Sequence, residues 1–351
     1  MDRRAMTKVL FILKKRDNPI GDKPISTGLY NSANFVHDML VKNGVDSKLS
    51  VVVDNNCIDR EVTLFRPDIV IVEAVWVVPE KFAILHQLHP KVKWIIRVHS
   101  DLPFMACEGM AMDWILDYVN CPNVRVSPNS EKMLYDIQTI CVGKHASLDK
   151  DIVYLPNYYP TKMSKPKAID YDKPWVDISC FGAIRPLKNQ LIQLVAAVDF
   201  VQKVGCKRLK FHVNTGRIES NGMPVDHNLR GLAQQLDPSR YELIFHHWAN
   251  HEDFLSLSSE MDIAMQVSFS ETFNIVGADQ VVQGVPFLGC DEIPWYTQGP
   301  VLTNDAQDIR DHLLNIYENP IRNVKINQYD LTKYVEDSEK TWLGFLESEQ
   351  K

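Results

Sequence analysis

Two acidic side chains with a helical spacing, Glu271 and Asp279, stand in the segment Ser268–Phe287 with seven residues between them. An apolar run over Met261–Val267 precedes them and has the composition of a buried strand. The segment itself predicts a polar loop, a helix that ends near Gly284 and a second apolar strand. Eight helical positions at about 100° each make a little over two turns, so both acids can project from one helix face. Carboxylates placed in this way accept hydrogen bonds from the hydroxyl groups of a ligand.

A basic turn follows another strand-like run, Val176–Ala183. Arg185 and Lys188 place two cations where a strand gives way to a long helix, and Gly182 lets the backbone approach a ligand closely. Fixed cations and helix N-terminal amides stabilise a leaving group that gains negative charge. The alternative interpretation is a solvated basic turn.

A third polar group ends the run that starts at Trp94, where His99 and Asp101 follow apolar residues. All of these polar groups stand at the carboxyl ends of expected strands, which is where open α/β sheets bind ligands. The alternative for His99 is a purely structural role. The alternative for Glu271 is that its charge complements the dipole at the start of a helix.

The chain has 351 residues, too many for one ordinary core, so we expect two domains. Strand-like and helix-like runs alternate throughout, which predicts an α/β fold with two Rossmann-like, mostly parallel sheets. Proline and charge accumulate over Asn157–Pro174 and indicate a linker. The expected division is a first domain at 1–160, a linker at 161–175 and a second domain at 176–329. An amphipathic helix over 330–351 ends the chain.

Composition and charge argue against several other classes of protein. A net charge of −7 gives no general attraction to DNA or to anionic membranes, and no apolar run approaches the roughly 20 residues that span a bilayer. Seven scattered cysteines without a C-x-x-C pair suit a reducing compartment, so we expect a cytoplasmic protein. His246 and His247 have no third ligand at metal spacing, so we expect no metal site.

These motifs resemble the retaining glycosyltransferases of the GT-B fold, group 1 type, whose signature is two acids separated by seven residues. The resemblance covers nearly the whole chain, from Lys8 to the terminal helix. It implies two Rossmann-like domains that face each other across a cleft, with the terminal helix crossing back onto the first. It further implies a UDP- or GDP-linked sugar as co-substrate, no cofactor, no metal, and transfer with retention of configuration. Two departures are an aspartate as the second acid and Arg-x2-Lys spacing where the family commonly has Arg-x4-Lys.

The resemblance also implies a role for each candidate residue. Glu271 would orient the donor sugar, Asp279 would bind the ribose, Arg185 and Lys188 would hold the diphosphate, and His99 would contact the sugar from the first domain. The other expected donor contacts are Gly182, Trp248, Ala249, Ser270, Thr272, Phe273 and Asn274, and the expected acceptor-side contacts are Gly28 and Asp101.

The acceptor class stays open among saccharides, small molecules and modified DNA bases, and so does the oligomeric state. A viral-type enzyme acting on a hydroxymethylated base would need a basic groove, to which Lys14, Lys15, Arg16 and Lys23 could contribute. A non-catalytic nucleotide-sugar binding module is a further alternative, suggested by the two departures from the family motifs. A sugar-nucleotide epimerase or phosphorylase on the same fold is the remaining one.

Overall fold

The computed structural model describes residues 7–15, 28–141, 151–205, 207–219 and 221–350. The chain divides into two compact units. The first contains the described residues up to Pro160 and those from Val335 onwards, and the second contains the described residues of Thr161–Tyr334. Of the basic residues considered for a DNA groove, Arg16 and Lys23 lie outside the described ranges.

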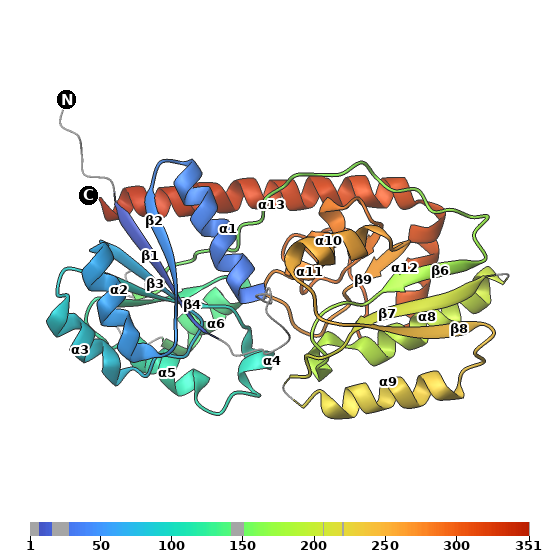
Figure 1. The fold of residues 1–351 in the computed structure, drawn as a ribbon, viewed down its shortest axis with the longest axis horizontal. Helices are drawn as coiled ribbons and strands as arrows, with labels where there is room; N and C mark the ends of the chain where they lie inside the picture. The colour runs from blue at the N-terminus through green and yellow to red at the C-terminus, as the bar shows by residue number, and fades with distance from the viewer. Residues whose placement is uncertain (1–6, 16–27, 142–150, 206, 220, 351) are drawn as a thin grey trace. The chain divides into compact units, whose positions relative to one another are not determined.

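The first unit is built on a parallel five-stranded sheet with the order β2-β1-β3-β4-β5 (Figure 1). Its strands are β1 (Lys8–Lys14), β2 (Asp46–Val52), β3 (Ile69–Glu73), β4 (Lys93–Val98) and β5 (Val124–Pro128). Its helices before the last one are α1 (Gly28–Lys42), η1 (Asn55–Cys57), α2 (Ile58–Phe65), α3 (Glu80–Leu88), α4 (Leu102–Met105), α5 (Ala111–Tyr118) and α6 (Glu131–Cys141).

Both faces of this sheet are covered, which is why its central strands read as continuous apolar runs. All five residues of β3 are buried. On one face, side chains of α2, α3, α5 and α6 pack around Val70, Trp94 and Ile96. On the other face, α1 packs with Trp342 of the terminal helix around Phe11.

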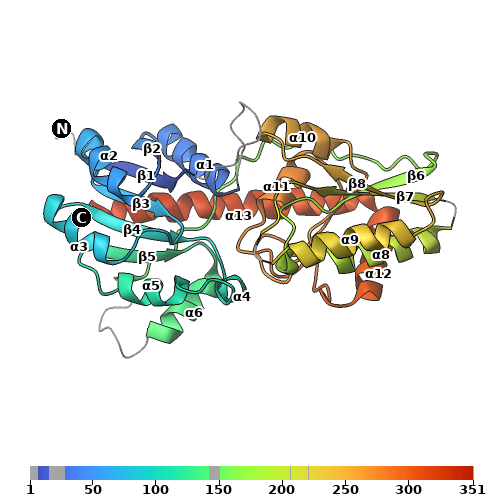
Figure 2. The same ribbon diagram turned by 60° about the horizontal axis from the view of Figure 1, so that its bottom comes forward.

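The second unit is built on another parallel five-stranded sheet, with the order β10-β9-β6-β7-β8. Its strands are β6 (Trp175–Ser179), β7 (Arg208–Asn214), β8 (Tyr241–His246), β9 (Ile263–Met265) and β10 (Phe287–Leu288). Figures 1 and 2 show α8 and α9 on one side of this sheet and α10 and α11 on the other. The helical elements are η2 (Pro186–Lys188), α8 (Gln190–Val204), α9 (Met223–Gln235), α10 (His251–Ser259), α11 (Ile275–Val282), α12 (Ala306–Glu318) and α13 (Pro320–Glu349).

The predicted fold class is confirmed: the chain is α/β, with two Rossmann-like parallel sheets. The cleft between the two halves stays a prediction. The 30-residue helix α13 begins in the second unit and ends in the first. Within the described part of the chain, every helix is too short or too polar to span a bilayer.

Candidate functional site

The basic turn and the Glu271 loop meet in the second unit, at the carboxyl edge of its sheet. Lys188 Nζ donates a hydrogen bond of 2.5 Å to Glu271 Oε1, and the two side chains are only 11% and 7% exposed. The backbone amide of Phe269 donates to the Leu187 carbonyl at 2.9 Å and holds the two loops together. The two sequence motifs therefore meet in one nearly buried ion pair.

The loop before α8 is held by amide side chains. Asn189 adopts a left-handed backbone conformation with φ of 56°, which asparagine tolerates better than most residues. Its Nδ2 donates to the carbonyls of Val267 at 3.0 Å and Thr303 at 2.6 Å. Gln193 donates to the Lys188 carbonyl at 2.8 Å and accepts from the Val267 amide at 2.9 Å. These bonds fix the position of Lys188.

The Glu271 loop ends at a second left-handed asparagine, Asn274, which caps α11. Its Oδ1 accepts from the Gly277 amide at 2.7 Å, and its Nδ2 donates to Gln266 Oε1 at 3.1 Å. Gly277 is required because a Cβ there would lie 2.7 Å from the ring of Phe287. The Asn274 side chain is thus committed to the cap, and a ligand would meet backbone amides of this loop.

Ser270 and Phe273 lie in the same loop, and both are buried. The Phe273 ring is part of the core, and its carbonyl accepts from Trp295 Nε1 at 2.6 Å. Thr272, between Glu271 and Phe273, is half-buried.

Gly182 lies opposite Lys188 at the end of β6. Its φ of +120° is a conformation that favours glycine, and the atom nearest to an added Cβ would be Lys188 Cε, 4.0 Å away. The Gly182 amide donates to Asn214 Oδ1 at 2.8 Å. The backbone therefore leaves space beside the Lys188 side chain, and the contact of Gly182 with a ligand stays a prediction.

Arg185 is linked to the end of β8 by residues that the sequence did not single out. Arg185 Nη1 lies 3.7 Å from Glu219 Oε2, and Arg217 Nε donates to Glu219 Oε1 at 2.5 Å. The Arg217 guanidinium lies 5.0 Å from the centre of the Trp248 ring. Arg185 and Trp248, both predicted donor contacts, are thus joined through Glu219 and Arg217, while Ala249 follows Trp248 directly.

Asp279 is buried, with 2% of its surface exposed, and its Oδ1 lies 2.7 Å from Nε2 of His251, the first residue of α10. The hydrogen bond to Asp279 raises the pKa of His251, an effect that burial opposes and that the charge of Asp279 reinforces. A ligand that reached Asp279 would also meet the His251 imidazole. The role of Asp279 at a ribose stays a prediction.

Replacing His251 with asparagine should therefore give a pH-dependent loss of stability. A raised pKa in the folded state means that the stabilisation by His251 is complete below about pH 6.5 and is lost as the pH rises through the folded-state pKa. The difference in unfolding free energy between wild type and His251→Asn is expected to be largest in mild acid and to shrink in alkali. Urea titrations at a series of pH values measure it, and a difference that grows with pH contradicts the assignment.

Two buried thiols, Cys180 and Cys290, lie close enough to Glu271 for its charge to act on them. Burial raises the pKa of each to about 12. Both are therefore neutral near pH 7, and neither provides a thiolate nucleophile. The charged groups that could act on a ligand at this sheet edge are therefore Lys188, Glu271 and Arg185.

One predicted residue of the first unit, His99, contacts a buried ion pair that sequence reasoning missed. Glu73 and Arg97 have no exposed surface, and Arg97 Nη1 lies 3.2 and 3.4 Å from the two Glu73 carboxylate oxygens. Arg97 Nη2 donates to Asn157 Oδ1 at 2.6 Å and to the Pro156 carbonyl at 2.9 Å. Glu73 and Arg97 stand opposite each other at the carboxyl ends of β3 and β4.

His99 is fixed by the same network. Its Nε2 bonds to the Glu73 carboxylate, and its Nδ1 lies 3.3 Å from Asn129 Nδ2. Burial holds the pKa of His99 below its usual value despite the Glu73 charge. Burial raises the pKa of Glu73, but Arg97 and His99 outweigh it and hold that pKa below its usual range. A neutral imidazole that donates from Nε2 to an ionised Glu73 satisfies all of these observations.

The two predicted acceptor-side residues differ in exposure. Asp101 is 1% exposed, and its Oδ1 accepts from Ser130 Oγ at 2.6 Å. Gly28 is the first residue of α1 and is exposed.

Comparison with known proteins finds no matching family model and no matching curated protein. Solved structures do match. The UDP-forming α,α-trehalose-phosphate synthase from Burkholderia vietnamiensis has a TM-score of 0.70 at 10% identity, over 98% of each chain. Sucrose-phosphate synthase from Thermosynechococcus elongatus has a TM-score of 0.67 at 12% identity, over 97% of this chain and 98% of that one. HepE from Anabaena, in complex with UDP, has a TM-score of 0.63 at 12% identity, over 97% of this chain and all (100%) of that one.

The chain has the GT-B glycosyltransferase fold. At identities of 10–12% the comparison shows only the fold. The chemistry of this GT-B chain is determined by its own residues. Those residues form two sets. The second unit brings together Gly182, Arg185, Lys188 and the Glu271 loop at one sheet edge, with Trp248 joined to Arg185. The first unit places His99 on Glu73.

Proposed function

We propose that this GT-B chain transfers a sugar from a nucleoside diphosphate sugar to a hydroxyl acceptor, with retention of configuration and without a metal. The observation that carries the proposal is the ion pair of Lys188 and Glu271, nearly buried at the carboxyl edge of the second sheet with Arg185 on the same turn. UDP is the nucleotide that we expect, because the solved structures with this fold include UDP-forming and UDP-bound proteins. We expect the reaction to take place in the cytoplasm.

Each charged group has a distinct part in this reaction. Lys188 and Arg185 would bind the diphosphate and stabilise its increasing negative charge as the sugar departs. Glu271 would accept hydrogen bonds from sugar hydroxyls and hold the ring in one orientation. Insertion of the diphosphate requires Lys188 and Arg185 to exchange their present carboxylate partners, Glu271 and Glu219, for phosphate oxygens. Donor binding is thus an exchange of ion-pair partners.

The bond changes balance without a protein base. The bond between the anomeric carbon and the phosphate oxygen breaks, and a bond from that carbon to the acceptor oxygen forms on the same face of the sugar. The acceptor proton passes to the departing phosphate oxygen. This route is the one implied by the family resemblance, and it asks of the protein only that it position the reactants and stabilise charge.

Thermal stabilisation by nucleotides tests the proposal. UDP, GDP, ADP, CMP and dTDP are compared, because a ligand at 100 times its dissociation constant adds about 2.7 kcal/mol to the unfolding free energy. We expect UDP to give the largest shift. If no nucleotide stabilises the protein, the proposed function is wrong. If UDP binds and UDP-sugars are never consumed, the protein is a binding module.

Replacing Arg185 with alanine should weaken UDP binding by about 10- to 100-fold and leave uridine binding unchanged. The reason is that a charge-assisted hydrogen bond contributes about 1.5–3 kcal/mol, and Arg185 would make its bonds to phosphate only. Calorimetric titration with UDP and with uridine measures both affinities. Arg230→Ala, which removes an exposed arginine on α9, is the matched control. Equal losses for nucleotide and nucleoside would contradict a phosphate role for Arg185.

A further inference from the structure

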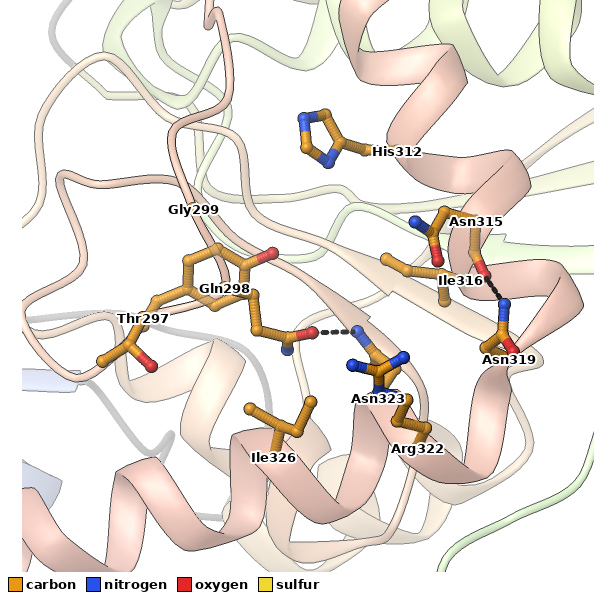
Figure 3. A pocket seen from close by; sticks show the side chains of 11 residues that line it. Thr297, Gln298, Gly299, His312, Asn315, Ile316, Asn319, Arg322, Asn323 and Ile326 are labelled. Carbon is orange, nitrogen blue, oxygen red and sulfur yellow. Dashed lines mark hydrogen bonds between the residues drawn. The ribbon is translucent and has the colours of Figure 1, made fainter.

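A polar pocket lies in the second unit, within a stretch that the proposed donor site does not use. It has a volume of about 520 Å³, within the range of small-ligand sites. Its walls come from the loop after β10, from the C-terminal half of α12 and from the first turns of α13 (Figure 3). Every residue that lines it falls between Tyr296 and Ile326. None of the residues assigned above to the donor is among them.

One wall is rigid because its amides are bonded to each other and to a strand. Gln298 Nε2 donates to Asn327 Oδ1 at 2.6 Å, and Gln298 Oε1 accepts from Asn323 Nδ2 at 3.2 Å. Asn323 in turn accepts from the backbone amide of Phe287 at 2.8 Å and donates to its carbonyl at 3.1 Å. Asn323 and Asn327 are both buried. This wall is therefore held in place by β10 before any ligand arrives.

The opposite wall and the rim carry polar groups that remain available. In the part of the chain that the structure describes, the side-chain amide of Asn315 and the guanidinium of Arg322 make no hydrogen bond, and Arg322 has no ion-pair partner. The side-chain amide of Asn319 donates only to the Asn315 carbonyl, at 3.3 Å, among the described residues. Figure 3 shows His312, Asn315 and Ile316 on one side of the pocket and Asn323 and Ile326 on the other, with Arg322 on the same helix as the latter two.

The charge of the pocket is the reverse of that of the whole protein. Among the described residues that line it there is no Asp or Glu, although the chain has a net charge of −7. Arg322 carries a permanent positive charge, and His312 Nε2 lies 3.7 Å from Asp308 Oδ2. An arginine without a carboxylate partner favours a phosphate or carboxylate group of a ligand.

The two amides of the opposite wall indicate what the rest of that ligand is. The side chains of Asn315 and Asn319 each combine a donor and an acceptor, which is the pairing that a sugar hydroxyl needs. We propose that this pocket binds an anionic monosaccharide, with Arg322 on its phosphate or carboxylate group and with Asn315 and Asn319 on its hydroxyls. The site is separate from the donor site, and its occupation does not depend on the function proposed above.

The test is calorimetric titration of the full chain, without nucleotide, against glucose 6-phosphate, glucuronate, glucose and inorganic phosphate. We expect binding of one or both anionic sugars, much weaker binding of glucose, and weaker binding of phosphate alone. The two charged sugars distinguish a phosphate-bearing from a carboxylate-bearing ligand. The proposal is overturned if neither anionic sugar binds, if glucose binds equally well, or if phosphate alone binds equally well.

Variants locate the binding. Arg322→Gln should weaken binding of the anionic sugar by at least about 10-fold, as expected for the loss of a charge-assisted hydrogen bond. Lys325→Gln removes an exposed cation from the same helix outside the pocket and should have no effect. Arg185→Ala should also have no effect, which separates this site from the donor site. Equal affinity in Arg322→Gln and wild type would show that the sugar binds elsewhere.

Discussion

Replacing Glu271 with glutamine is expected to lower the consumption of a UDP-sugar by at least about 100-fold. Glutamine keeps the size of the side chain and can still accept a hydrogen bond from Lys188, but it removes the negative charge that balances that lysine in a nearly buried site. The sugar then loses its charged hydrogen-bond acceptor. Release of UDP from the UDP-sugar, with water as the acceptor of the sugar, measures the effect, and this readout needs no knowledge of the natural acceptor.

Two measurements separate a catalytic effect from damage to the fold. The loss of a charged partner for Lys188 should cost about 1–3 kcal/mol of stability, so Glu271→Gln should remain folded at room temperature. The variant should also still bind UDP, since Lys188 and Arg185 are intact. Glu252→Gln, an exposed acid in the first turn of α10, is the control and should behave as wild type. Full consumption of the donor by Glu271→Gln would remove this residue from the mechanism.

Replacing Glu73 with alanine is expected to cost about 3–5 kcal/mol of unfolding free energy, because it leaves the Arg97 charge buried without its partner. Arg97 would keep its bonds to the Pro156 carbonyl and to Asn157, but neither of these is charged. Urea unfolding followed by circular dichroism measures the loss. Glu80→Ala, an exposed acid in the first turn of α3, should change stability by less than about 0.5 kcal/mol.

A double variant tests whether the cost comes from the pair. The double variant Glu73→Leu, Arg97→Met replaces both charges by apolar side chains. Its loss of unfolding free energy should be well below the sum of the losses in Glu73→Leu alone and Arg97→Met alone. Additive costs would show that the two side chains do not act on each other.

Because the pKa of Glu73 is held below its usual range, its stabilising effect is present above the ordinary pKa of a glutamate and is lost as the pH falls through the folded-state value.

The sequence could predict the two parallel sheets and the common location of Lys188 and Glu271, because both follow from local patterns, but it did not predict the ion pair between them. Apolar runs such as Ile69–Glu73 have the composition of strands buried on both faces. Strands that are parallel end on one edge of their sheet, so polar groups that follow different strands, such as Lys188 and Glu271, were expected to meet.

The sequence could not reveal partners that are set by strand register or by loop packing. Glu73 ends an apolar strand and looks like an ordinary terminal residue, but it stands opposite Arg97 in the pairing of β3 with β4. Glu219 reaches Arg185 only because Ile218 pairs with Ile184. Asp279 stands in the middle of a helix, where acidic side chains are commonly exposed, yet it is buried and bonded to His251 of α10. In each case the partner lies more than 20 residues away and carries no motif of its own.

The shared helix α13 has a consequence for the order in which the chain folds during synthesis. The core of the first unit includes Trp342 and Leu346, and Trp342 Nε1 donates to the Pro156 carbonyl at 2.8 Å. A ribosome that has made the first 334 residues has supplied the whole of the second unit, while the first unit still lacks the part of its core that the end of α13 provides. The half that is translated first is therefore completed last, and a chain released early would expose the apolar surface around Phe11 that Trp342 covers.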